Sequence, residues 1–84
     1  MQELAMKKTL LEKAFEQASV TQIDACWAVL KYKNIGILRK VRCISFILGV
    51  DYNEVLNEVP TSDDGRIYDK ATRNLIHNEL IKYS

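Results

Sequence analysis

The sequence has few of the residue types that metal, disulfide or nucleotide sites require. Its 84 residues include one proline, three glycines, one histidine and two cysteines. Cys26 and Cys43 lie far apart within apolar segments, with no CxxC pair and only His77 to join them at a metal. We therefore expect two reduced core thiols, with a disulfide as the alternative. The glycines form no phosphate-binding loop, and we expect no metal and no cofactor.

Long apolar segments are also lacking. No stretch approaches the roughly 20 residues needed to span a bilayer, and no secretory signal pattern opens the chain. We expect a soluble, cytoplasmic protein that does not bind a membrane. The length predicts one domain, residues 1–84, and homodimerisation is one way in which so small a core could be stabilised.

Acidic residues are missing from the middle of the chain. None lies between Asp24 and Asp51, whereas the whole chain has a net charge of only +1. The same stretch contains five cations: Lys31, Lys33, Arg39, Lys40 and Arg42. This segregation predicts a face for an anionic partner, either DNA or an acidic protein. The other interpretation is a solvated surface, with aliphatic stems lying over Trp27 and Tyr32.

Hydrophobic periodicity predicts helices along most of the chain, and hence an all-α bundle of about five helices. The expected helices cover residues 2–18, Thr21 to the break at 34–36, Ile37–Leu48, Tyr52–Val59, and Asp69 to the C-terminus. Trp27 is the largest expected core anchor in this pattern.

Four residues are expected to begin or end these helices. Thr21, with Asp24 three positions later, resembles a capping box. Gly49 should close the third helix, Asp51 should cap the fourth, and Pro60 should stop it.

The segment 61–68 has two interpretations. Asp64-Gly65 is a common tight-turn dipeptide, so Arg66 to Tyr68 would suit a very short wing hairpin. The alternative is an irregular loop leading into the last helix, which is favoured because Val59-Pro60-Thr61 makes a poor strand.

The stretch Val41–Pro60 resembles a helix-turn-helix unit of twenty residues. The family's apolar, small and glycine positions are occupied, at unit positions 4, 5, 8, 9, 10 and 15, by Ile44, Ser45, Leu48, Gly49, Val50 and Val55. A small side chain lets the second helix cross closely, and glycine permits a left-handed turn. Glu58 departs from the usual apolar residue, and Val59 beside it would substitute. Residues 44–56 also look like two helices of lambda-repressor-like domains.

The resemblance implies DNA binding, with Asp51 to Val59 as the recognition helix. Its base-reading side chains would be Tyr52, Asn53 and Asn57. Asp51, Glu54 and Glu58 on the same helix repel phosphates. DNA contact would then depend on the five upstream cations, giving salt-dependent and weakly sequence-specific binding.

No pattern in the sequence indicates an enzyme. His77 and Glu79 are two apart on an expected helix and point in different directions, and we expect His77 to be an exposed helical residue. Asp63, Asp64 and Asp69 lack the spacing of a calcium loop and are better explained by turns and caps. Two functions remain: a small helix-turn-helix-like transcriptional regulator, or a protein-interaction module such as an inhibitor, antitoxin or adaptor.

Overall fold

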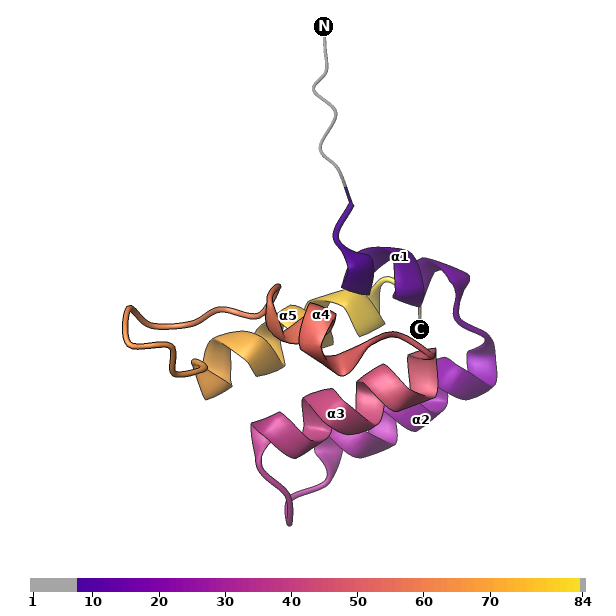
Figure 1. Cartoon of the computed structure of the whole chain (residues 1–84). Helices are drawn as coiled ribbons and strands as arrows, with labels where there is room; N and C mark the ends of the chain where they lie inside the picture. Colours follow the sequence, from indigo (N-terminus) through magenta and orange to yellow (C-terminus); the bar gives the residue numbers. More distant parts are fainter. Residues whose placement is uncertain (1–7, 84) are drawn as a thin grey trace, which may run out of the picture.

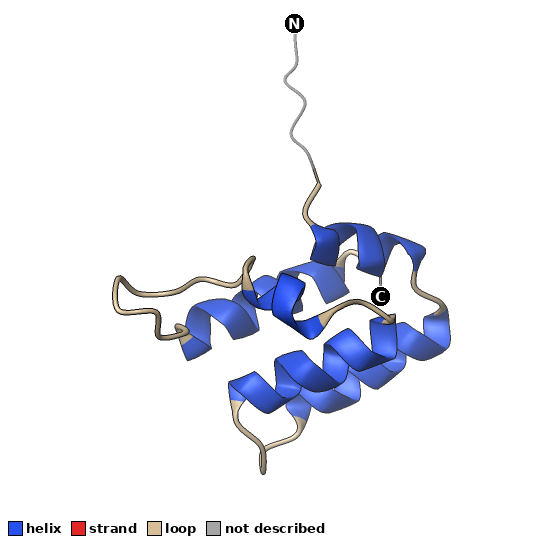
Figure 2. Ribbon diagram, viewed as in Figure 1, coloured by secondary structure: helices blue, strands red, loops and turns tan. Residues whose placement is uncertain are grey.

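The chain folds as a small all-α bundle, as predicted from hydrophobic periodicity (Figures 1 and 2). The computed structural model describes residues 8–83. Its five helices are α1 (Leu10–Gln17), α2 (Val20–Lys31), α3 (Ile37–Leu48), α4 (Tyr52–Leu56) and α5 (Asp69–Ile81). The most extensive helix pair is α2 with α3, which lie side by side below the other three helices in Figure 1. None of the helices described in residues 8–83 has the length and apolar character needed to cross a bilayer.

Helix α1 begins later than residue 2. The Thr9 hydroxyl accepts the Glu12 N–H at 3.1 Å, and the Glu12 carboxylate accepts the Thr9 N–H at 3.0 Å. This reciprocal capping box holds Thr9 in an extended conformation, so the prediction of a helix already running through residues 8 and 9 is wrong. The predicted helical residues 2–7 lie outside the described part of the chain.

The N-cap of helix α2 lies two residues before the predicted cap. Ser19, not Thr21, accepts the Gln22 N–H at 3.1 Å, and the Gln22 side chain accepts the Ser19 N–H at 2.8 Å. The Gln22 amide also donates to the Ile47 carbonyl of α3 at 2.9 Å. One glutamine therefore caps α2 and fastens it to α3, which explains why Ser19 is selected over Thr21.

The corner between α3 and α4 has the predicted local features. Gly49 adopts a left-handed conformation at φ 73°, and the Val50 N–H donates to the Ser45 carbonyl at 3.0 Å, as in a Schellman motif. Ser45 is buried, and its hydroxyl donates to the Val41 carbonyl at 2.8 Å. Asp51 caps α4 by accepting the Asn53 and Glu54 N–H groups. Assignment to the helix-turn-helix family itself stays a prediction.

Helix α4 is shorter than predicted. It ends at Leu56, and Glu58 donates its N–H to the Val55 carbonyl at 2.9 Å in a tighter turn. Val59 precedes Pro60, which disfavours helical backbone at Val59. Val59 is buried and Glu58 is not, so Val59 does occupy the core in place of Glu58.

The connection from α4 to α5 extends away from the helices (Figure 1). Its only bridge within the described residues joins Thr61 to Ile67, and no strand forms there. Gly65 has φ 84°, and the Ser62 N–H donates to the Arg66 carbonyl at 2.7 Å. The tight turn at Asp64-Gly65 is thus present, while the rest is closer to the irregular-loop interpretation than to a wing.

The core lies where α1, α2, α3 and α5 meet, with Val55 contributed by α4. Phe15 is the largest fully buried side chain. The prediction that Trp27 is the largest core anchor is wrong, because Trp27 is half-buried at the edge of the core. Cys26 is buried as predicted, but Cys43 is exposed, so only one thiol belongs to the core; both are free.

Candidate nucleic-acid interface

The outer face of α3 carries exposed cations next to apolar side chains. Helical spacing places Arg39, Arg42 and Phe46 on the side of α3 turned away from the core, where all three are exposed. The Arg42 guanidinium carbon lies 4.8 Å from the centroid of the Tyr52 ring, a cation–π contact that joins α3 to the start of α4. A shallow groove of about 460 Å³ runs along this face, lined by Leu38, Arg39, Arg42, Cys43 and Tyr52.

Two further cations come from the end of α2 and the turn that follows it. Lys31 and Lys33 are both exposed. The Lys31 Nζ lies 5.1 Å from the centroid of the Trp27 ring, a contact that agrees with the solvated-surface interpretation, in which basic side chains lie over Trp27. The His77 ring of α5 meets the same indole edge-on at 5.3 Å, and His77 is exposed as predicted. These contacts hold α2 against α5 beside the basic turn.

Lys40 does not belong to the exposed set. It is only 3% exposed, and its Nζ donates to the Leu30 carbonyl at 2.5 Å. Burial and, to a smaller extent, the charge of Arg73 lower the pKa of Lys40. The lysine thus satisfies a carbonyl at the C-terminal end of α2, where the helix dipole favours a cation. The prediction of Lys40 as a freely exposed phosphate contact is corrected accordingly.

Arg73 joins the basic side chains although it lies far from them in sequence. It projects from α5 into a groove of about 470 Å³ lined by Leu30, Lys31, Tyr32, Lys33, Ile35, Lys40 and Arg73. No carboxylate lines this groove or the one along α3. Nothing in the periodicity of α5 distinguishes Arg73 from Lys70, its other exposed cation, so only the packing of α5 against the α2–α3 pair identifies it.

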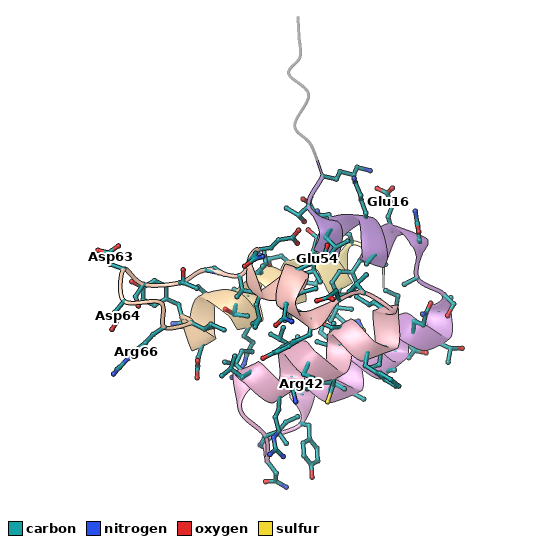
Figure 3. All side chains as sticks on the ribbon, viewed as in Figure 1. Glu16, Arg42, Glu54, Asp63, Asp64 and Arg66 are labelled. Carbon is teal, nitrogen blue, oxygen red and sulfur yellow. The ribbon has the colours of Figure 1, made fainter. Side chains whose placement is uncertain are left out.

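No carboxylate of the described residues forms an ion pair with the exposed cations of this basic end. Within residues 8–83 the ion pairs are Lys8–Glu16, Arg66–Asp64 and Lys82–Glu79. None of them involves Lys31, Lys33, Arg39, Arg42 or Arg73. Figure 3 shows Arg42 on α3 apart from Glu16 on α1 and from Asp63 and Asp64 on the extended loop. Acidic side chains do approach this face from α4, because Asp51 and Glu54 are exposed and flank in sequence Tyr52, the residue on which Arg42 packs.

Helix α4 offers little as a base reader. Its five residues correspond to a rise of about 7 Å, a turn and a half. Asn53 and Asn57 are exposed, whereas Tyr52 is half-buried under Arg42. Asp51 and Glu54 are exposed beside the asparagines. The carboxylates oppose the approach of phosphates to the helix that the resemblance assigns to the major groove.

The described residues contain no cluster of three or more histidine, cysteine or acidic side chains suited to a metal ion. Burial raises the pKa of the Cys26 thiol to about 11, so Cys26 stays protonated and unreactive at neutral pH. The α3 groove itself is lined by two arginines and by the exposed, free thiol of Cys43.

Comparison of the chain with protein-family models, with curated proteins and with solved structures gives no match.

Proposed function

We propose that this protein binds DNA through its phosphate backbone, using the exposed cations Lys31, Lys33, Arg39 and Arg42. The observation that carries the proposal is the absence, within residues 8–83, of any carboxylate paired with these cations. Unpaired lysine and arginine side chains on one face can neutralise neighbouring phosphates and release counterions. The predicted role in transcriptional regulation would follow from such binding.

Sequence readout contributes little in this proposal. Asn53 and Asn57 are the exposed amides of α4 and its C-terminal end, and both have acidic neighbours. We therefore infer binding with weak sequence preference, in which specificity comes from DNA shape or from a second protein.

Removal of two cations from the α3 face tests this proposal. The variant Arg39→Gln/Arg42→Gln should bind a labelled random-sequence duplex about tenfold or more weakly at low salt, because each lost contact is a charge-assisted hydrogen bond. Fluorescence anisotropy gives the dissociation constants.

The matched control is Lys13→Gln/Arg66→Gln, which removes the same charge from exposed positions on α1 and the α4–α5 loop. Equal weakening in the two variants would mean that only net charge matters, and would overturn the assignment of the face. Circular dichroism should show the same helical content in both.

The alternative function, binding of an acidic protein, is favoured by one observation. Phe46 is 87% exposed on the same face of α3 as Arg42, and Leu38 is half exposed. An amphipathic acidic helix from a partner could cover the apolar side chains and form ion pairs with the basic ones. Phe46→Ser separates the two functions, since it should leave DNA affinity within about twofold but would abolish a contact that depends on the aromatic ring.

A further inference from the structure

The groove between the α2–α3 turn and α5 contains four cationic side chains and no acid. Lys31 and Lys33 come from the end of α2 and the following turn, Lys40 from α3, and Arg73 from α5. Arg73 is distant in sequence from the other three, so the groove forms only when α5 packs against the α2–α3 pair. Like charges held together in this way repel each other unless an anion lies between them.

Lys40 distinguishes this groove from an ordinary basic surface. The side chain lines the groove, yet it is only 3% exposed. Its ammonium group has three donors, and within residues 8–83 its hydrogen bond is to the Leu30 carbonyl alone. A buried lysine without a carboxylate partner is costly for a folded protein, and an anion in the groove would lower that cost.

The chemistry of the lining favours a phosphate group as that anion. Lysine acts as a compact point charge, and the planar guanidinium of arginine can donate two parallel hydrogen bonds to phosphate oxygens. Arg73 is exposed, as are Lys31 and Lys33. These three side chains can therefore close on a ligand while Lys40 supplies fixed positive charge beneath it.

We propose that this groove binds a single phosphate group, which is a backbone phosphodiester when the ligand is DNA, with Arg73 as its main hydrogen-bond donor. This inference rests on the proposed function, and it adds α5 to an interface that would otherwise be confined to α2, α3 and the turn between them. DNA would then contact two grooves, one along α3 and one reaching α5.

The variant Arg73→Gln tests the inference in the full chain. Its affinity for the labelled duplex should fall about tenfold, and the slope of log affinity against log salt should become shallower by about 0.9, the value for one phosphate contact. The matched control Lys13→Gln removes one exposed helical cation at a distance and should change affinity by less than about twofold. If the two variants retain DNA binding with the same affinity and the same salt slope, the groove is not a phosphate site, while the proposed function still holds.

A second measurement uses inorganic phosphate as the probe. Titration of the ¹⁵N-labelled protein should shift backbone amide signals at residues 30–35 and 73, and Arg73→Gln should abolish these shifts. Phosphate shifts without DNA binding would support the groove and contradict the proposed function. Absence of both shifts and DNA binding would overturn both.

Discussion

At the scale of single residues, Glu58 has a role that its position in the helix-turn-helix pattern does not predict. Its carboxylate accepts the N–H groups of Leu10 at 2.7 Å and Leu11 at 3.0 Å. Backbone N–H groups in the first turn of a helix have no carbonyl partner within the helix, and the helix dipole favours a negative charge beside them. The acid that departs from the family pattern therefore joins the end of α4 to the start of α1.

Replacement of Glu58 should destabilise the fold. Glu58→Ala leaves two partly buried N–H groups without partners, and we expect a loss of about 1–2 kcal/mol in the free energy of unfolding. Glu54→Ala is the control, because Glu54 is an exposed acid of α4. Urea unfolding followed by circular dichroism measures both. Equal stabilities of the two variants would contradict the capping role.

The raised pKa of Cys26 predicts that the protein loses stability in alkaline solution. Burial raises its pKa from 9.0 to about 11, so the thiol ionises in the unfolded chain before it ionises in the folded one. The unfolded state therefore binds fewer protons between pH 9 and 11, and the free energy of unfolding should fall by up to about 3 kcal/mol across that range.

Comparison with Cys26→Ala isolates this contribution. The variant should be less stable than the wild type at pH 7, because it leaves a small cavity, but the difference should shrink or reverse toward pH 11. Lys40 has the opposite effect on stability below pH 10.5. Because its pKa is lowered in the folded state, its contribution makes the free energy of unfolding rise with pH, and this contribution is the same in the wild type and the variant. Parallel pH profiles of the two proteins would contradict the assignment to Cys26.

At the scale of elements, the α3–α4 corner depends on the left-handed conformation of Gly49. Apart from Gly49 and its chain neighbours, no described atom lies within 4 Å of the position that a Cβ would occupy there, so backbone strain is the main obstacle to a side chain. Gly49→Ala should cost about 1–2 kcal/mol in unfolding free energy. Gly36→Ala is the matched control, because Gly36 has φ −76° and equally open surroundings.

Thermal and urea unfolding of the two alanine variants measure this difference. Gly36→Ala should stay within about 0.5 kcal/mol of the wild type, since its backbone suits any residue. Equal costs at the two glycines would show that the corner does not depend on a left-handed residue.

The number and order of the helices were predictable from the sequence. The residues at which they begin and end were predictable only where one local signal dominated. Gly49 and Asp51 are such signals, and the structure confirms both. Ser19 and Thr21 are both good caps in isolation, and the choice of Ser19 depends on a contact between Gln22 and α3 that sequence spacing does not contain. Tertiary packing decides such cases.

At the scale of the whole molecule, the charge segregation was predictable and the composition of the basic end was not. The absence of acids between Asp24 and Asp51 predicts a basic surface on this segment. It does not predict that Lys40 is buried, or that Arg73 of α5 lies beside the lysines of that segment. The sequence likewise predicts Trp27 as a core anchor, because size and helical spacing cannot show that its indole lies at the edge of the core, in contact with Lys31 and His77. Dimerisation of this bipolar molecule stays a prediction.

The salt dependence of DNA binding by the wild-type protein tests the central claim most directly. Four exposed cations on phosphates, with Arg73 as a fifth, predict a slope of log affinity against log salt between about −3.5 and −4.5 on a random-sequence duplex. Such a slope would show that the basic end neutralises four or five phosphates at once. A slope near zero, or no binding at low salt, would contradict the claim and leave the exposed α3 face to an acidic protein partner.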